Sequence, residues 1–432
     1  MSGKPCVLAY SGGLDTTAIV LWLRERGYEV HAVLVDVGQG EDLPALCSKA
    51  LRLGASSAVV RDARPAMFET VVPMALGLAA RYEGTYRLGT ALARPFIAVE
   101  QVRLARRMGG ATLVHGATGK GNDQIRFEYA YRTLAPDCPV LAPWKEWDFA
   151  GRRDLLAYVV RHGADEGFEP TKDFSLDENL WHLSIEGGPL ENPAADLNVE
   201  QVLAAHASRF AGGVGPRPAP PTAMVTFDQG VPVAVNGATL ALPELIARLN
   251  RDYRAAPWAW DLVIENRCTG IKSRGLYINP AAALLHSAAD GLARSCLNKP
   301  SYEAWCDLGR QYAGLLYRGE YFSDQRRAVE AAGRALMSRL TGAVTMQTSP
   351  ALHATRIDAP QALFRHDRAT FERSDYAHAD AAGFIRLGWL GAIGRSIAEE
   401  SHACALETGD TAASDVRCDQ SLPGGRLVPA AV

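Results

Sequence analysis

Residues 7–17 read VLAYSGGLDTT, and this stretch decides the fold of the first part of the chain. The apolar run at residues 7–10 predicts a short strand, and Ile19, Trp22 and Leu23 follow at helical spacing. Between strand and helix, two glycines let the backbone turn tightly and approach a ligand closely. Because the free N–H groups at a helix N-terminus attract anions, the stretch predicts a loop that binds phosphate.

The same loop leaves a simpler interpretation open, namely an ordinary strand-to-helix turn capped by Ser11 or Asp15. It is not a Walker A loop, which requires GxxxxGK followed by Ser or Thr. A lone Asp15 carboxylate would repel a phosphate, and a Mg²⁺ ion between the two would remove this repulsion. Helix capping by Asp15 is the competing hypothesis.

Strands and helices alternate through the first third of the chain. Short β-branched runs predict four further strands, at residues 31–36, 58–61, 112–115 and 140–141. The spacing of Leu43, Leu46 and Ala50 predicts one helix, and residues 93–108 predict another. Such alternation is typical of βαβ units. We therefore expect an α/β, Rossmann-like fold with a parallel sheet, whose ligands bind beyond the carboxyl ends of the strands.

The pattern changes after residue 165 to that of an α+β domain. A Gly- and Pro-rich stretch at residues 211–222 predicts a loop or linker. Asn236-Gly237 indicates a tight turn after two short strands. The expected strands lie at residues 224–227, 231–235 and 262–265, and the expected helices at residues 242–254, 304–318 and 325–340. Weak periodicity at residues 403–432 predicts a poorly ordered tail.

Composition limits the possible functions. The 432 residues are 48% apolar and 22% charged with a net charge of −3, close to an average globular protein. The near-neutral charge does not indicate binding to nucleic acid or to an anionic membrane. No apolar run reaches the length of a transmembrane helix, and the first residues do not resemble a signal peptide. Eight scattered cysteines without a CxxC pair favour neither zinc nor disulfides, so we expect a cytoplasmic protein.

A second polar loop, HGATGKGNDQIRFE at residues 115–128, again follows a predicted strand. It combines three glycines with Lys120 and a dense set of polar side chains. Gly121 follows Lys120 where a P-loop would have Ser or Thr, so this segment is not a P-loop. A polar surface turn is the competing interpretation, but so many polar groups at one strand end favour a binding loop.

These motifs together resemble one family. SGGLDTT resembles the pyrophosphate loop of the N-type ATP pyrophosphatases, which cleave ATP between its α- and β-phosphates. The segment at residues 115–128 resembles the ATP and aspartate segment of argininosuccinate synthases. Five further stretches resemble that family in the same order: YRLGTALARP at 86–95, SLDENL at 175–180, HLS at 182–184, ENR at 265–267 and KSRGLY at 272–277. The resemblance extends from about residue 5 to about residue 390.

The resemblance implies an AMP-forming ligase of arginine biosynthesis. Citrulline, ATP and aspartate would give argininosuccinate, AMP and pyrophosphate through a citrulline-adenylate. It also implies a nucleotide-binding domain similar to adenine nucleotide alpha hydrolases at residues 1–165, and a synthetase and oligomerisation domain at residues 166–383. A C-terminal helix at residues 384–402 would precede the tail. Family members are homotetramers, so we expect this helix to contribute to an oligomer contact.

The resemblance further implies the site residues, each at its matching position in this sequence. Asp15, Lys120 and Arg126 would be catalytic. ATP would contact Ala9, Tyr10, Ser11, Gly12, Gly13, Leu14, Asp15, Thr16, Thr17, Val35 and Gly116. Aspartate would contact Thr118, Asn122 and Asp123. Citrulline would contact Tyr86, Asn122, Arg126, Ser175, Ser184, Glu265 and Tyr277. Mg²⁺ would arrive with ATP, with no protein ligand assignable beyond a position near Asp15.

One departure keeps other hypotheses open. Ala91 stands where the family has a serine in the citrulline site, which removes one hydroxyl. The alternative is an aspartate ligase of specialised metabolism that acts on a different ureido or carboxyl acceptor. A third hypothesis, a non-catalytic nucleotide-binding protein, is disfavoured by the intact loops. A tRNA-thiolating enzyme is disfavoured because no catalytic cysteine pair and no basic surface are present.

Overall fold

A computed structural model describes residues 3–165, 167–168, 174–206, 219–364, 377–390, 416–417 and 428–429. The chain divides into two units, Met1–Leu363 and Phe364–Val432, which we describe separately. The first unit contains three sheets and almost all of the helices in the described residues.

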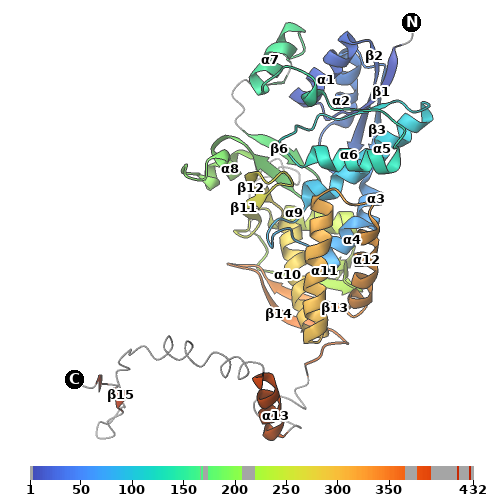
Figure 1. Cartoon of the computed structure of the whole chain (residues 1–432). Coiled ribbons are helices and arrows are strands. Elements are labelled where there is room, and N and C mark those ends of the chain that lie inside the picture. Colours follow the sequence, from blue (N-terminus) through green and yellow to red (C-terminus); the bar gives the residue numbers. More distant parts are fainter. Residues whose placement is uncertain are drawn as a thin grey trace, which may run out of the picture. The chain divides into compact units, whose positions relative to one another are not determined.

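Five parallel strands form the first sheet, in the order β3-β2-β1-β4-β5 (Figure 1). Their bounds are Lys4–Ala9 for β1, Tyr28–Asp36 for β2, Ser57–Asp62 for β3, Thr112–Val114 for β4 and Val140–Leu141 for β5. In the centre, Val7 pairs with both His31 and Leu113. The strand order reverses between β1 and β4, and such a reversal leaves a ligand-binding crevice at the carboxyl ends. All five strands predicted from the sequence are confirmed.

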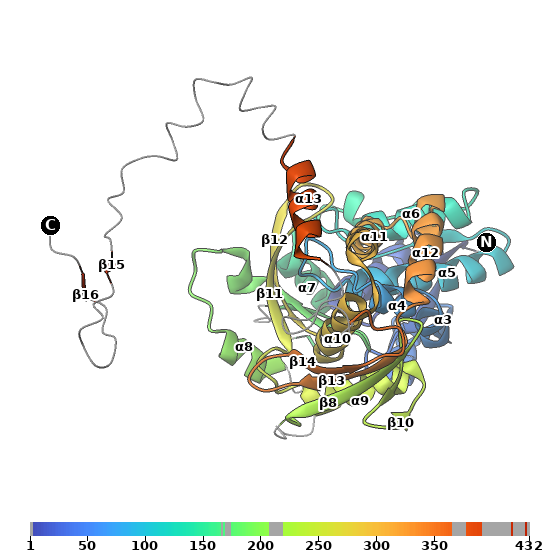
Figure 2. The same cartoon turned by 90° about the horizontal axis from the view of Figure 1, so that it is seen from below.

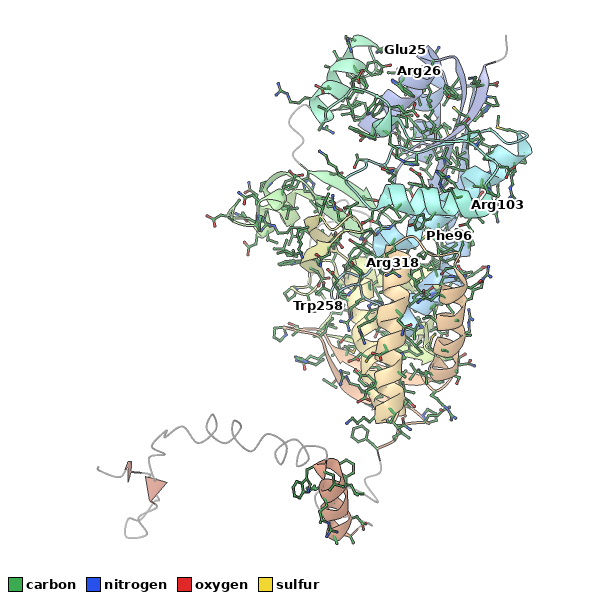
Figure 3. The ribbon with its side chains drawn as sticks, in the orientation of Figure 1. Glu25, Arg26, Phe96, Arg103, Trp258 and Arg318 are labelled. Carbon is green, nitrogen blue, oxygen red and sulfur yellow. The ribbon has the colours of Figure 1, made fainter. Side chains whose placement is uncertain are left out.

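Helices cover both faces of this sheet because alternate residues of each strand point to opposite sides. Cys6 and Leu8 pack with one set of helices, and Val7 packs with the other. The first set is α1 (Leu14–Glu25), α2 (Leu43–Arg52) and α7 (Arg152–Arg161), near the short helix η1 (Pro143–Lys145). The second set is α3 (Arg64–Glu69), α5 (Gly89–Arg107) and α6 (Asp123–Leu134), whereas α4 (Val71–Gly77) packs against α3, α10 (Pro280–Cys296) and β9 (Val231–Val235). On α5, Phe96 packs against Tyr321, whereas Arg103 is exposed (Figure 3).

The second sheet is antiparallel, in the order β11-β12-β7-β6. Its strands are β6 (Ser175–Glu178), β7 (Leu183–Glu186), β11 (Trp260–Asn266) and β12 (Lys272–Ile278). We call it the acceptor sheet, because four of its residues are the expected acceptor ligands. Leu183, Ile185 and Leu276 face an apolar cluster that includes residues of the short helix η2 (Gly188–Glu191) and of α8 (Val199–His206).

The other face of the acceptor sheet is polar. Cross-strand pairs join Glu265 to Ser273, Tyr277 to Ser184 and Ser184 to Asp177. Because paired residues share a face and alternate residues repeat it, one surface collects these polar side chains. We call this surface the acceptor face and define it by Ser175, Asp177, Ser184, Glu186, Glu265, Ser273 and Tyr277.

A third, antiparallel sheet has the order β10-β9-β8-β13-β14. Its strands are β8 (Thr222–Asp228), β9 (Val231–Val235), β10 (Ala238–Thr239), β13 (Gly342–Gln347) and β14 (His353–Asp358). Asn236 and Gly237 have positive φ angles of 50° and 79°, as the predicted two-residue hairpin turn requires. The accompanying helices are α9 (Leu242–Tyr253), α10 (Pro280–Cys296), α11 (Lys299–Tyr317) and α12 (Asp324–Met337), and α10 lies along β13 and β14 (Figure 2).

Several elements were not predicted from the sequence, above all the buried helix α10. Its residues are nearly all apolar or small, so it lacks the polar face by which a surface helix is recognised. The α11 prediction began five residues late, and the strands β6, β7, β12, β13 and β14 were not predicted. These strands are paired with distant segments, and local sequence carries little information about such pairing.

The second unit contributes the helix α13 (His378–Gly388). The helix expected at residues 384–402 overlaps it at residues 384–388, and residues 391–402 lie outside the described part. Of the expected tail, the structure describes only β15 (Val416–Arg417) and β16 (Val428–Pro429), an antiparallel pair. Most of the expected linker at residues 211–222 also lies outside the described part, and the predicted domain boundaries remain predictions.

No helix among the described residues is long and apolar enough to cross a membrane.

Two glycines of α11 provide a stability test. A Cβ atom on Gly309 would lie 2.5 Å from the backbone oxygen of Leu78, whereas one on Gly314 would meet only the flexible end of Arg318. Gly309→Ala is expected to lower the free energy of unfolding by about 1–3 kcal/mol, because the backbone cannot move aside cheaply. Gly314→Ala should raise it by up to about 1 kcal/mol through helix propensity. Denaturant melts of both variants measure this; equal effects would show that α11 does not pack this closely.

Candidate active site

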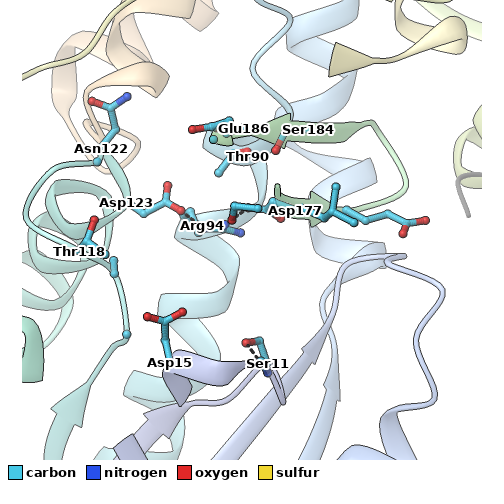
Figure 4. A pocket seen from close by; sticks show the side chains of 18 of the residues that line it. Ser11, Asp15, Thr90, Arg94, Thr118, Asn122, Asp123, Asp177, Ser184 and Glu186 are labelled. Carbon is cyan, nitrogen blue, oxygen red and sulfur yellow. Dashed lines mark hydrogen bonds and ion pairs between the residues drawn. The ribbon is translucent and has the colours of Figure 1, made fainter. Parts of the chain in front are cut away.

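A cavity of about 1470 Å³ lies between the carboxyl ends of the parallel strands and the acceptor face (Figure 4). Thr17 is the one expected site residue that does not line it; its side chain is buried. The cavity brings together all the other expected residues: Ala9, Tyr10, Ser11, Gly12, Gly13, Leu14, Asp15, Thr16, Val35, Tyr86, Gly116, Thr118, Lys120, Asn122, Asp123, Arg126, Ser175, Ser184, Glu265 and Tyr277.

The loop between β1 and α1 presents backbone donors to this cavity. Gly12 has a positive φ of 75°, which a residue with a side chain rarely adopts. Gly13 is the N-cap of α1, and no side chain caps the first turn. The hydroxyls of Ser11 and Thr16 lie 3.2 Å apart, and Lys49 donates to the Gly12 carbonyl at 3.1 Å. The uncapped first turn is therefore suited to bind an anion.

Asp15 points into the lower part of the cavity from the first turn of α1 (Figure 4). Burial raises the pKa of its carboxyl, and the positive charge of Arg152 partly offsets this rise. Arg152 and Trp144 line the same part of the cavity. A carboxylate there can approach bound phosphates only if a cation or a proton lies between them.

His115 holds the start of the second glycine loop through a hydrogen bond. Its Nδ1 accepts the backbone N–H of Ala117 at 3.2 Å, so its Nε2 carries the proton and lies 3.6 Å from Glu128. Glu128 also accepts from Lys145 at 2.5 Å. His115 and Lys145 together hold the pKa of Glu128 at about 2. The start of the loop is thus fixed by the His115 imidazole, which lies beside the ionised carboxylate of Glu128.

A series of alternating charges, partly buried, crosses the middle of the cavity. Arg126 donates to one oxygen of Asp123 at 2.8 Å, and Arg94 donates to the other oxygen at 2.8 Å. Arg94 also donates to Asp177 on β6. Burial would raise the pKa of Asp123, but the two guanidinium groups hold it below its ordinary value. Burial raises the pKa of Asp177, which has a single arginine partner, above its ordinary value.

Glu265 Oε2 on the acceptor face and Arg126 Nη2 on α6 are buried without a hydrogen-bond partner in the described residues. Glu265 is 5% exposed, and its Oε1 accepts from the Tyr277 hydroxyl at 3.2 Å. Burial and the neighbouring charge of Glu186 raise the pKa of Glu265 to about 7. The remaining Arg126 donors bind Asp123 and, at 3.0 Å, the carbonyl of Tyr317.

Tyr277 and Tyr86 line the cavity together with Glu265 and Arg126. A Cβ on Gly275 would lie 2.7 Å from the Tyr277 hydroxyl, so a glycine here lets the Tyr277 ring lie across the strand toward Glu265. The Tyr86 and Tyr277 rings lie 4.8 Å apart, and the backbone N–H of Thr90 donates to the Tyr86 hydroxyl at 3.3 Å. Ala91 is fully buried and does not line the cavity.

The sequence analysis gave no role to Arg94, Asp177, Glu186 and Arg267, which line the cavity, or to Tyr317, whose carbonyl holds Arg126. Asp177 and Glu186 could have been found, because strand alternation places them on the same face as Ser175 and Ser184. Arg94 follows the predicted residue Tyr86 by eight positions, on the helix α5. Tyr317 carries no local signal, because its contact with Arg126 joins residues 191 positions apart.

Metal ligands are sparse. Within the described ranges, no group of three or more His, Cys, Asp or Glu side chains could hold a metal ion. The six described cysteines are free thiols. Asp15 is thus not part of a carboxylate cluster, among the residues that the structure describes, that would form a cation cage by itself.

Comparison with known proteins agrees with this geometry. The family model described as the arginosuccinate synthase N-terminal HUP domain matches residues 5–165, and that of the arginosuccinate synthase C-terminal domain matches residues 174–392. A solved structure described as a predicted subunit of a tRNA methyltransferase from Methanocaldococcus jannaschii covers 40% of this chain and is itself covered to 78%. Its TM-score is 0.25 and its identity 16%, too low to bear on the fold.

Curated relatives are similar over most of the chain, and each is named argininosuccinate synthase. The relative from Desulfitobacterium hafniense is 37% identical over 92% of this chain and 98% of its own length. The relative from Idiomarina loihiensis is 41% identical over 89% and 95%. The relative from Nitratidesulfovibrio vulgaris is 40% identical over 90% and 98%. With both family models matching as well, this chain belongs to the argininosuccinate synthase family.

Proposed function

We propose that this enzyme condenses citrulline with aspartate at the expense of ATP and releases argininosuccinate, AMP and pyrophosphate. The pair of unpartnered buried atoms, one on the acceptor face and one on α6, carries this proposal. Glu265 Oε2 lacks a donor and Arg126 Nη2 lacks an acceptor. The α-ammonium of one amino acid can donate to Glu265, and its α-carboxylate can accept from Arg126. Leaving either buried side chain without a hydrogen-bond partner would cost free energy. The names of the relatives favour citrulline over another acceptor.

ATP occupies the end of the cavity formed by the parallel sheet. The uncapped first turn of α1 and the hydroxyls of Ser11 and Thr16 bind the β- and γ-phosphates. Ala9 and Val35 form the apolar wall against the adenine, and Gly116 lies opposite the α1 loop at the end of β4. Thr17 contributes through packing beneath the loop rather than by contact, since its side chain is buried outside the cavity lining.

Aspartate binds to the second glycine loop. The side-chain carbonyl of Asn122 already accepts the backbone N–H of Cys268 at 2.8 Å. Its amide group therefore has only N–H donors left, which suit a carboxylate. Thr118 adds a hydroxyl, and Lys120, which is exposed to the cavity, adds a positive charge. Asp123 acts mainly by fixing Arg94 and Arg126, because both of its oxygens are bound to them.

The chain mainly positions and neutralises the reactants. The ureido oxygen attacks the α-phosphorus, and the bond to the β-phosphate breaks with its electron pair on pyrophosphate. The first turn of α1 receives that charge. The amine of aspartate then attacks the ureido carbon and displaces AMP. Arg126 and Glu265 hold the acceptor at its amino-acid end, so its ureido group points along the acceptor face toward the nucleotide.

Mg²⁺ accompanies ATP in this proposal and neutralises its phosphates. Asp15 is the carboxylate that would contact the ion, directly or through water, because it points into the cavity from the first turn of α1. The remaining ligands would be phosphate oxygens and water, as is usual for Mg²⁺ in nucleotide sites. The raised pKa of Asp15 supports this assignment, because burial there favours a neutralising cation.

We also place the enzyme in the cytoplasm as a homotetramer. The free thiols of the described cysteines support a reducing compartment. The α13 helix supports self-association, because Phe384 and Leu387 on it are 80% and 73% exposed and lie three residues apart, and Leu390 just beyond its end is 59% exposed. Exposed apolar side chains in such a row are typical of a protein contact.

The activity is tested by measuring AMP and pyrophosphate release from ATP with aspartate and a panel of acceptors. We expect release that depends on citrulline and on aspartate together, with argininosuccinate as the product. The panel includes other ureido compounds and the matching carboxylates. Release that depends on one of these compounds instead of citrulline would contradict the proposal.

The acceptor site should depend on pH through Glu265. Its pKa of about 7 means that the free enzyme gains the ionised carboxylate as pH rises through neutrality. An α-ammonium needs that ionised form, so KM for citrulline should fall from pH 6 to pH 8 and then level off. Glu265→Gln should raise KM by at least about tenfold, as expected for loss of a charged hydrogen bond. It should also remove this pH dependence, while KM for ATP serves as the control. An unchanged pH profile in Glu265→Gln would rule out this role.

Self-association through α13 predicts that Leu387→Asp lowers the oligomeric state. Ala382 lies on the opposite side of α13 from Leu387 at 100° per residue, so Ala382→Asp is the matched control. Size-exclusion chromatography with light scattering should show smaller species for Leu387→Asp only. A tetramer that persists in Leu387→Asp would place the contact elsewhere.

A further inference from the structure

The turn at residues 267–271, between β11 and β12, contacts both halves of the cavity. Its base is anchored on Asn266. The Tyr82 hydroxyl donates to the Asn266 carbonyl at 2.9 Å, and the Asn266 N–H donates to Glu83 at 3.0 Å. Lys272 closes the turn by donating to the Asn266 side chain. The backbone of the turn is therefore fixed before any substrate binds.

Arg267 extends from this turn, and its guanidinium donates hydrogen bonds to three acceptors. Nη1 donates to the backbone carbonyl of Lys120 at 3.0 Å. Nη2 donates to Glu186 at 3.1 Å and to Ser273 at 2.9 Å. Glu186 and Ser273 belong to the acceptor face, whereas Lys120 belongs to the second glycine loop. One planar, permanently charged group thus joins the two amino-acid subsites.

The next residue of the turn makes a second contact with the same loop. The backbone N–H of Cys268 donates to Asn122 Oδ1 at 2.8 Å, which orients the Asn122 amide. Inside the loop, the one backbone hydrogen bond that the structure gives for residues 118–121 is long, from Gly121 to Thr118 at 3.4 Å. Its two glycines, Gly119 and Gly121, make this segment costly to order by itself. Its shape therefore depends on the contacts from the turn.

We propose that Arg267 is a positioning residue that fixes the loop of Thr118 and Asn122 for aspartate, and so serves the second half-reaction more than the first. The inference rests on the function proposed above. Adenylation uses the α1 loop, Arg126 and Glu265, none of which receives a hydrogen bond from Arg267 in the described structure. Attack by the amine requires aspartate to be held by the loop that Arg267 anchors.

An ordinary ion pair between Arg267 and Glu186 is the competing explanation. The Arg267 side chain is 21% exposed, and pairs near the surface contribute little to stability. If Arg267 formed only such a pair, its removal would leave aspartate binding unchanged. The contact with the Lys120 carbonyl separates the two explanations, because a lysine can replace the charge but cannot reach Glu186 and that carbonyl with one planar group.

The test compares Arg267→Met, Arg267→Lys and a control, Arg294→Met. Arg294 pairs with Asp290 at 2.8 Å on α10, outside the cavity, so its removal deletes a similar ion pair away from the site. Adenylation is followed without aspartate by positional isotope exchange in ¹⁸O-labelled ATP with citrulline. The second half-reaction is followed as argininosuccinate formation with KM for aspartate. Hydrogen exchange of the peptide that contains residues 116–127 reports loop order without any turnover.

We expect Arg267→Met to raise KM for aspartate by about ten- to a hundredfold, the range for losing hydrogen bonds to a charged group. Isotope exchange should stay within about twofold of the parent enzyme, and loop amides should exchange faster. Arg267→Lys should give an intermediate KM, and Arg294→Met should match the parent. Equal loss of isotope exchange, or an unchanged KM for aspartate, would overturn the inference. An absence of citrulline-dependent exchange in the parent enzyme would instead contradict the proposed function.

Discussion

Four charged side chains hold the site together: Arg126 and Asp123 on α6, Arg94 on α5 and Asp177 on β6. They alternate in sign and lie at or near the centre of the cavity, so each guanidinium neutralises the carboxylates beside it. Desolvating a single one would cost several kcal/mol, roughly, without its partners. These four charges link the parallel-sheet side of the cavity to the acceptor sheet. Removing any one of them would take a partner from a neighbouring charge. These four side chains therefore help to hold the substrate ligands in position on both sides of the cavity.

The acceptor sheet shows how strand alternation can separate stability from recognition. Leu183, Ile185 and Leu276 face the apolar cluster, while the acceptor face looks into the cavity. Gly275 occupies the one position on the polar side where a side chain would displace the Tyr277 ring. Recognition of an amino acid is thus built from alternate positions of four short strands, and the positions between them maintain the core.

The sequence predicted the parallel sheet well because each strand contains a short apolar run next to a turn or a helix. It predicted the phosphate loop for the same reason, since strand, glycines and helix follow one another within residues 7–23. Helix α10 could not be recognised, because a helix buried on most sides has no polar stripe. Arg267 was quoted within a motif but given no role, because its partners Lys120 and Glu186 are brought to it only by the fold. Local pattern therefore predicts elements and loops, whereas the residues that connect distant loops require the structure.

The alternating faces of the acceptor sheet also constrain how this family can change. Inserting or deleting one residue within β7 would exchange Ser184 and Glu186 for Leu183 and Ile185, turning polar groups into the core and apolar groups into the cavity. Length changes in these strands are therefore disfavoured. Substitutions at every second residue, in contrast, alter the cavity without touching the core. New acceptor specificities are accordingly expected to arise by point substitution on one face of the sheet, with its length and register kept.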